Sequence, residues 1–394
     1  MRKRRRRTAV AVVGVLAALT AGCTPPGVER QRARSGSAKA ARTAPGGFTL
    51  VATGDVIPHD AVIRQAHQDG ARSGTAYDFR PMLAGVRGVV AGADVAICHM
   101  ETVYGEANGP FSGYPLFVSP PQIAQALKET GYDSCSTASN HTLDAGPAGV
   151  RRTLDAMDAA GLRHAGSART AAEGAGVTLL PAGRAKLAHL SYTYATNGIP
   201  VPHDQPWAVN LMDRDRILAD ARAARRAGAD VVVVSLHWGT EWQQEPDAQQ
   251  LTLARELTAA ATGGRPDVDL ILGTHNHVPQ AYEKVNGTWV VYGMGDQLAG
   301  EMFNPAGAPD ARGNRSSIAR FTFAPPPRAG QRWPVVKAEF VPQLTDLKPP
   351  LRVVDLNRAV ADQPERSDLA DARERIRAAV LSRGAGKDGL VLAD

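Results

Sequence analysis

Short apolar segments alternate with amphipathic segments along most of the chain. Residues 231–234 and similar runs lack polar residues at alternate positions, which is typical of strands buried on both faces of a sheet. The pattern predicts strands at 48–53, 94–98, 132–137, 187–192, 230–236, 268–273, 280–285, 288–292, 317–323 and 335–341. It predicts helices at 60–69, 81–91, 121–130, 147–160, 213–227, 247–262 and 368–382. This alternation favours an α/β fold with a largely parallel sheet, whose late strands pair antiparallel because no helix separates them.

The same pattern divides the chain into segments. One large domain is expected from residue 47 to residue 345, because no linker interrupts the alternation. Residues 346–394 are polar with one amphipathic stretch, which predicts a C-terminal tail with a peripheral helix. Residues 23–46 are rich in Arg, Ala, Gly, Ser and Pro without apolar periodicity, so they are expected to form a disordered tether.

The first 22 residues have the pattern of an export signal. Six consecutive basic residues precede an apolar run at 9–19, which is too short to span a bilayer. The run ends in Leu19-Thr-Ala-Gly-Cys23, which resembles a bacterial lipobox. We therefore predict an exported lipoprotein that is held on the outer face of the cell membrane by lipid on Cys23. An ordinary signal peptide with an incidental cysteine is the alternative.

Charge and cysteine content add two expectations. The chain has 45 Lys and Arg against 39 Asp and Glu, but six of the basic residues lie in the signal, so the remainder is formally neutral. Nucleic acid is therefore not an expected partner. Beyond Cys23, the remaining cysteines are Cys98 and Cys135, both in apolar runs, where free cysteine behaves as a small buried hydrophobe. We expect buried thiols, with a disulfide as the alternative in an oxidising compartment.

Polar and titratable residues gather at the carboxyl ends of five predicted strands. In open α/β sheets this edge is where ligands bind, so the side chains are expected to form one site. Two histidines separated by one residue, on a turn after a strand, place both imidazoles on the same side. The candidate residues are Asp55, Glu101, Asn140, His141, Asp144, His237, Glu241, His275 and His277.

This mixture of donors predicts divalent metal ions. Carboxylate, imidazole and amide oxygen together suit Mn, Fe or Zn, whereas a closed structural zinc site favours four Cys and His ligands. Two metals about 3.5–4 Å apart can clamp an in-line displacement. Each residue alone has a plain structural explanation, such as a helix cap or a packed core histidine, and the prediction rests on their joint occurrence. The remaining histidines are expected to be structural or at the surface: His59, His67, His164, His189 and His203.

Several motifs in this order resemble the CapA family, named for poly-γ-glutamate capsule synthesis, within the calcineurin-like metallophosphatase superfamily. The resemblance covers about 48–300 and implies a four-layered α/β/β/α sandwich. The motifs are Val51-Ala-Thr-Gly-Asp55, Met100-Glu101, Ala138-Ser-Asn-His141 with Asp144-Ala-Gly146, Val234-Ser-Leu-His-Trp-Gly-Thr-Glu-Trp242, Gly273-Thr-His-Asn-His-Val-Pro-Gln280 and Tyr292-Gly-Met-Gly-Asp296.

The resemblance also implies a role for each matching residue. Asp55 and His277 would bind one metal, and Glu101 would bridge to a second. Asn140, His237 and His275 would complete the second metal. His141 would lie beside the substrate as a general acid or oxyanion donor, while Asp144 and Glu241 would orient imidazoles.

The chain departs from the family pattern at three places. It has His99-Met100 before Glu101, where the family usually has Asn-Leu, and Gly295-Asp296-Gln297 where the family has Gly-Asn-Phe. It has Asp55-Val56-Ile57 where the superfamily has Asp-x-His, so the first metal lacks one expected histidine. This metal is expected to be weakly held or absent unless His59 or His99 replaces that histidine, and one or two bound ions are therefore expected.

Two functional classes follow. The first is a metal-dependent hydrolase outside the membrane, acting on a phosphoester or on an amide or ester in an anionic polymer such as poly-γ-glutamate or cell-wall material. The second is a non-catalytic, lipid-anchored accessory subunit that grips or exports polymer beside a membrane synthase. A third hypothesis is the binding protein of a transporter. It is weaker, because such a function does not explain the clustered histidines at the strand ends.

Overall fold

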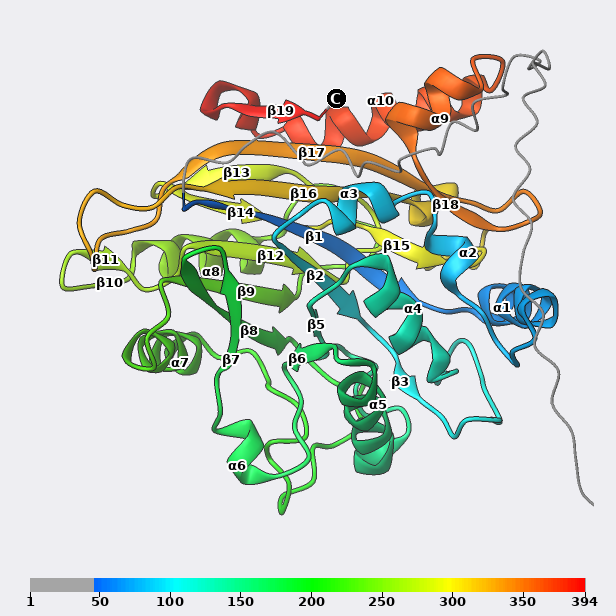
Figure 1. Ribbon diagram of the computed structural model, residues 1–394, viewed down its shortest axis with the longest axis horizontal. Coiled ribbons are helices and arrows are strands. Elements are labelled where there is room, and N and C mark those ends of the chain that lie inside the picture. The colour runs from blue at the N-terminus through cyan, green and yellow to red at the C-terminus, as the bar shows by residue number, and fades with distance from the viewer. Residues whose placement is uncertain (1–45, 394) are drawn as a thin grey trace, which may run out of the picture. The chain divides into compact units, whose positions relative to one another are not determined.

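Two β-sheets form the centre of the computed structural model, which describes residues 46–393 (Figure 1). The predicted signal peptide, the predicted lipid-attachment residue Cys23 and nearly all of the predicted tether lie outside the described residues. The first sheet has the order β18 (Arg352–Asp355), β17 (Val335–Asp346), β16 (Arg315–Phe323), β1 (Phe48–Ile57), β2 (Val95–Met100), β5 (Ser134–Ser136) and β6 (Arg163–Ala165). In addition, β15 (Asp296–Ala299) pairs with β1, and β19 (Leu390–Leu392) pairs with β17.

The second sheet has six strands. Their order is β13 (Tyr282–Val285), β14 (Thr288–Val291), β12 (Leu270–Thr274), β9 (Val231–His237), β8 (Ala185–Thr193) and β7 (Thr178–Ala182). Two small ribbons accompany the sheets: β3 (Val103–Tyr104) with β4 (Val118–Ser119), and β10 (Ala261–Thr262) with β11 (Arg265–Pro266). The central strands of both sheets run parallel and the late strands antiparallel, as the sequence predicts.

Helices cover the outer faces of both sheets. The first sheet packs on α1 (Asp60–Ser73), α2 (Arg80–Leu83), α3 (Arg87–Ala91), α4 (Gln122–Thr130) and α5 (Gly146–Ala160). The second sheet packs on α7 (Arg214–Arg226) and α8 (Ala248–Ala259), and α6 (Ala171–Gly174) is a single turn. Because the largest core cluster joins the inner faces of the two sheets, the four-layered α/β/β/α sandwich is confirmed.

Two helix predictions have informative outcomes. Asp213 caps α7 as its position suggests, since its side chain accepts a hydrogen bond from the Arg216 amide. The helix predicted at 81–91 is instead broken into α2 and α3. Gly85 lies between them against the Val353 carbonyl of β18, at a distance that a side chain would obstruct. Contact with a strand far away in sequence therefore interrupts a locally favourable helix.

The C-terminal segment contributes more than the predicted peripheral helix. Besides α10 (Ser367–Leu381), it contains α9 (Leu356–Asp362) and the strands β18 and β19, which pair with β17. Leu369, Ile376 and Val380 of α10 join the central core cluster. Arg352 of β18 also forms a two-pronged ion pair with the buried Asp69 of α1. These contacts attach the segment to the sandwich. Within residues 46–393, no helix is both long enough and apolar enough to cross a membrane.

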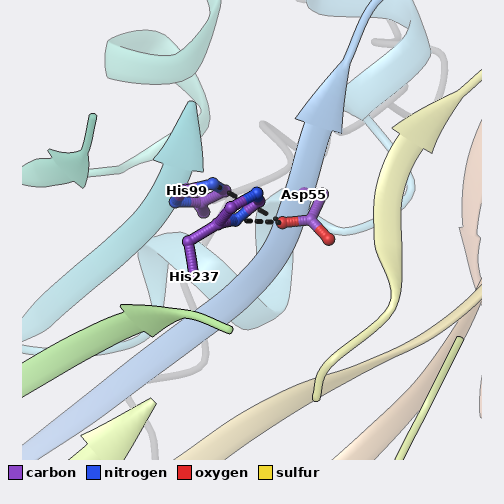
Figure 2. A group of neighbouring side chains, drawn as sticks. All are labelled: Asp55, His99 and His237. Carbon is purple, nitrogen blue, oxygen red and sulfur yellow. Dashed lines mark ion pairs between the residues drawn. The ribbon is translucent and has the colours of Figure 1, made fainter. Parts of the chain in front are cut away.

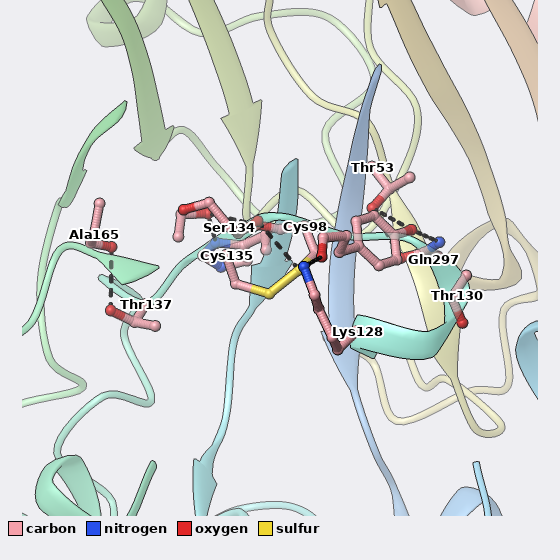
Figure 3. The surroundings of a disulfide bond; sticks show 12 residues. Thr53, Cys98, Lys128, Thr130, Ser134, Cys135, Thr137, Ala165 and Gln297 are labelled. Carbon is pink, nitrogen blue, oxygen red and sulfur yellow. Dashed lines mark hydrogen bonds between the residues drawn. A yellow bond between two sulfur atoms is a disulfide. The ribbon is translucent and has the colours of Figure 1, made fainter. Parts of the chain in front are cut away.

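The cysteine prediction is wrong: Cys98 and Cys135 form a disulfide (Figure 3). They face each other across the parallel pair β2 and β5, with Cα atoms 4.4 Å apart. Both side chains are fully buried. The pairing depends on the register between two strands, which neither cysteine's local sequence reveals.

Candidate metal centre

The carboxylates of the site come from adjacent strands of the first sheet. Asp55 lies within β1 rather than after it, at a point where the register with β2 shifts. Its amide donates to the Gly295 carbonyl at 3.0 Å, and Gly54 makes this approach possible because a side chain there would meet the same carbonyl. Glu101 directly follows β2. Asp55 and Glu101 are both fully or almost fully buried.

The histidines come from the second sheet. His237 is the last residue of β9, and His275 and His277 follow β12. His275 and His277 have φ values of 93° and 57°, a region that residues with side chains seldom adopt. Such strain persists only where the surrounding structure enforces it, and it is concentrated at functional sites. The turn therefore directs both imidazoles toward the carboxylates of the opposite sheet.

These side chains meet in one buried cluster. His237 Nε2 lies 2.8 Å from Asn140 Oδ1 and 3.7 Å from Glu101 Oε1. The backbone amide of His275 donates to Asp55 Oδ2 at 3.1 Å. Possible ligand atoms lie within 4.8 Å of one another in three overlapping groups: Glu101, His237 and His275; Asp55, His277 and Asp296; and Asp55, His99 and His237. The structure thus brings together all six residues predicted as metal ligands.

Several polar atoms in this cluster are buried without a hydrogen-bond partner. Leaving such atoms unpaired costs free energy, so each calls for an explanation. All of them can donate a lone pair to a cation, and their nitrogen and oxygen chemistry is compatible with a divalent metal ion. They are Asp55 Oδ1, His99 Nε2, both carboxylate oxygens of Glu101, His275 Nδ1 and Asp296 Oδ2.

Burial dominates the acid–base properties of the cluster. It raises the pKa of Asp55 and of Glu101 well above the usual range, and neighbouring carboxylates add to the effect. It lowers the pKa values of His237 and His275 well below the ordinary value. Burial also lowers the pKa of His277, but the neighbouring carboxylates of Asp296, Glu101 and Asp55 together outweigh it, so the pKa of His277 is raised. Nearby positive charge would counter the penalty on the acids, as a cation does.

The predicted catalytic pair lies beside the cluster. His141 Nδ1 is 2.7 Å from Asp144 Oδ2, which also accepts the Phe117 amide at 2.7 Å. The Phe117 ring packs edge-on against the imidazole, with ring centres 4.8 Å apart. Asn197 Nδ2 approaches His141 Nε2 at 3.5 Å. Asp144 therefore orients His141 through Nδ1, and Nε2 lies at the opposite end of the ring, where only the long contact from Asn197 approaches it among the described residues.

A cleft of about 770 Å³ leads to His141 and to His277. Its wall includes Trp242, and the largely exposed rings of Tyr114 and Phe303 stand beside it. Glu241 also faces the cleft and is exposed. Among the described residues Glu241 forms no hydrogen bond with an imidazole, so the structure does not place it in the orienting role implied by the family resemblance. The cleft therefore opens the site to solvent beside His141 and His277.

Two residues of the cluster were not assigned a firm role from sequence. Asp296 of β15 accepts a hydrogen bond from His277 Nδ1 at 2.9 Å, which orients that imidazole. His99 Nε2 lies 3.6 Å from Asp55 Oδ1 (Figure 2). Asp296 ends the last motif that resembles the family, and His99 was one of two histidines considered as a replacement ligand, but neither was placed among the predicted metal ligands. By contrast, His189 is held between Ser134 and Ser235 in the core, in agreement with a structural role.

The chain is similar in sequence to known bacterial capsule synthesis proteins. A family model described as bacterial capsule synthesis protein PGA_cap matches residues 49–301. The chain is 27% identical over 179 residues to the capsule biosynthesis protein CapA of Bacillus anthracis, covering 44% of this chain and 42% of that protein. It is 26% identical over 177 residues to the PGA biosynthesis protein CapA of Bacillus subtilis, covering 44% of each. The chain spans about half the length of the curated relatives it matches.

The chain also aligns with solved structures at low sequence identity. A putative 5'-nucleotidase from Staphylococcus aureus aligns with a TM-score of 0.46 and 14% identity, over 82% of this chain and 58% of that one. The calcineurin-like phosphoesterase YfkN from Bacillus subtilis aligns with a TM-score of 0.37 and 14% identity, over 84% and 99%.

Proposed function

Because the chain belongs to the bacterial capsule synthesis protein PGA_cap family, we propose that it is a metal-dependent hydrolase of cell-envelope polymer metabolism. Its substrate is a phosphoester, or an ester or amide bond in an anionic polymer such as poly-γ-glutamate. The observation that carries the proposal is the cluster of buried lone-pair donors without hydrogen-bond partners, next to an oriented histidine. The protein acts outside the cell membrane, anchored through Cys23.

Within this proposal the ligands divide between two metal positions. Asp55 and His277 would hold one ion, Asn140, His237 and His275 would hold the other, and Glu101 would be shared between them. Mn, Fe or Zn suits these donors. A divalent metal in this site would supply Lewis acidity and would activate water near neutral pH.

The chain's own residues position the substrate and move the proton. The cleft wall at Trp242 and Phe117 admits the substrate and excludes bulk water from its inner end. His141 donates a proton from Nε2 to the leaving group, which is an oxygen in an ester and a nitrogen in an amide, or stabilises negative charge on the attacked phosphoryl or carbonyl oxygen. Asp144 holds Nδ1 at 2.7 Å, and this fixes the ring with Nε2 free to act.

A direct test measures metal content and hydrolysis together. Purified protein loaded with Mn²⁺, Fe²⁺ or Zn²⁺ is expected to cleave bis(p-nitrophenyl) phosphate or p-nitrophenyl acetate. Chelation should remove the activity, and re-addition of the metal should restore it. Protein that holds less than one metal ion per chain, or that hydrolyses equally well after chelation, would contradict the proposal.

Replacement of Asp144 by asparagine is expected to lower kcat about 10-fold to 100-fold without changing metal content, because the imidazole loses its anionic partner. Asparagine can still accept the Phe117 amide, so the loop should stay folded. Steady-state kinetics at saturating metal give kcat. Asp94→Asn is a matched control, since Asp94 accepts the Thr49 amide far from His141. An unchanged kcat in Asp144→Asn would remove Asp144 from the mechanism.

The second candidate is a non-catalytic accessory that supports a membrane synthase. It is favoured by the family description, which names capsule synthesis and no reaction. In a strain whose polymer production depends on this protein, an accessory should still complement after His277→Ala. A hydrolase should not.

A further inference from the structure

We propose that His99 is a metal ligand beside Asp55. It supplies the histidine that the first metal position lacks, for which the sequence offers two candidates, His59 and His99. The inference rests on the proposed metal centre and specifies which residues of this chain build it. It assigns a role to a histidine that the CapA pattern does not contain.

The backbone places His99 directly beside Asp55. The two residues face each other in the register of the parallel pair β1 and β2. Glu101 lies two residues beyond His99, so in extended backbone both side chains point to the same face of the sheet. His99 is 1% exposed, which leaves no route for solvent to satisfy its ring. His99 therefore shares one buried space with Asp55 and Glu101.

The ring of His99 is oriented with its free nitrogen toward Asp55. Its Nδ1 lies 2.7 Å from Ser136 Oγ, and that hydroxyl donates its own proton to the Cys98 carbonyl at 3.3 Å. The Ser136 oxygen is then an acceptor for the Nδ1 proton. Nε2 consequently carries the lone pair. A hydrogen bond on one ring nitrogen that directs the other toward a metal is the usual arrangement for ligating histidines.

Two acceptor atoms face each other as a result. Nε2 of His99 lies 3.6 Å from Oδ1 of Asp55, and neither atom has a hydrogen-bond partner. Metal bonds to nitrogen and oxygen of about 2.0–2.2 Å place two ligand atoms of one ion about 3–4 Å apart. The separation therefore suits a shared cation.

The neighbouring imidazole does not compete for this position. The rings of His99 and His237 are stacked with centres 4.7 Å apart, and both point toward Asp55 (Figure 2). However, His237 Nε2 is directed to Asn140 and Glu101, on the side assigned to the second metal. His99 thus adds a donor on the Asp55 side, where the sequence shows a missing histidine.

His59 does not meet the same conditions. Its Nδ1 lies 3.0 Å from the Ile57 carbonyl, and the Gly300 amide approaches the same atom. Its ring packs against Phe117 in the cleft wall, and it belongs to none of the three ligand groups found in residues 46–393. Of the two histidines that the sequence leaves open, the structure favours His99.

Cobalt binding tests the proposal without relying on activity. The wild-type protein, His99→Gln and His99→Asn are titrated with Co²⁺, followed by visible absorption and by metal analysis after gel filtration. Asparagine is the residue that the CapA pattern has at this position, so this variant guards against a folding defect. His189→Gln is the matched control, because His189 is equally buried but is held by two serines.

Both His99 variants are expected to bind one fewer Co²⁺ per chain, or to bind one Co²⁺ at least 10-fold more weakly, with a changed absorption spectrum. His189→Gln should match the wild type. If the His99 variants bind Co²⁺ with wild-type stoichiometry, affinity and spectrum, His99 is not a ligand and the proposal is overturned. If the wild-type protein itself binds no Co²⁺, the proposed metal centre fails, and with it this inference.

Discussion

Replacement of His237 by alanine is expected to abolish hydrolysis and to remove at least one bound metal ion. His237 occupies the middle of the cluster, within 4.0 Å of carboxylate oxygens of both Asp55 and Glu101 and 2.8 Å from Asn140. Among the described residues, no other imidazole contacts all three of these residues within 4.0 Å. Loss of the second metal position should lower the hydrolysis rate about 1,000-fold, which corresponds to about 4 kcal/mol of transition-state stabilisation.

The measurement combines metal analysis with hydrolysis rates for His237→Ala and His237→Gln. Glutamine fills more of the space left by the ring, so agreement between the two variants separates loss of a ligand from loss of packing. His203→Ala is the control, because His203 is exposed. Full metal occupancy with wild-type rates in both His237 variants would show that the cluster is not the site of the reaction.

Removal of the disulfide is expected to destabilise the protein by about 4 kcal/mol. Cys98 and Cys135 are 37 residues apart, and a cross-link that closes a loop of this length restricts the unfolded chain by about that amount. The bond also joins β2 to β5. Glu101 follows β2, and the loop after β5 contains Asn140 and His141, so loosening this pair should weaken metal binding as well as folding.

Urea unfolding of the double variant Cys98→Ala, Cys135→Ala gives the change in free energy of unfolding. A reducing agent should destabilise the wild-type protein by a similar amount and leave the double variant unaffected, which controls for other effects of the reagent. A difference of less than about 1 kcal/mol between the oxidised wild type and the double variant would contradict the expectation.

Much of the site was predictable because its chemistry is local in sequence. Each of Asp55, Glu101, His237 and His275 lies near the end of a strand whose apolar run is short and unmistakable. Parallel pairing brings the strand ends of each sheet to one edge, whereas the meeting of the two edges depends on how the two sheets pack. Asp296 was harder to assign, since the short strand β15 that carries it has no strong apolar pattern and is recognised only by its pairing with β1.

The sequence by itself determined the order of most strands and helices and the set of candidate metal-ligand residue types, because periodicity and residue chemistry need no distant partner. The four-layered class of fold followed from the resemblance to the CapA family. Tertiary structure alone decided which of these residues meet. The left-handed backbone of His275 and His277, the bond between Cys98 and Cys135, and the pairing of His99 with Asp55 all depend on register between segments distant in the chain. Register is set by packing of the whole core, so no local pattern specifies it.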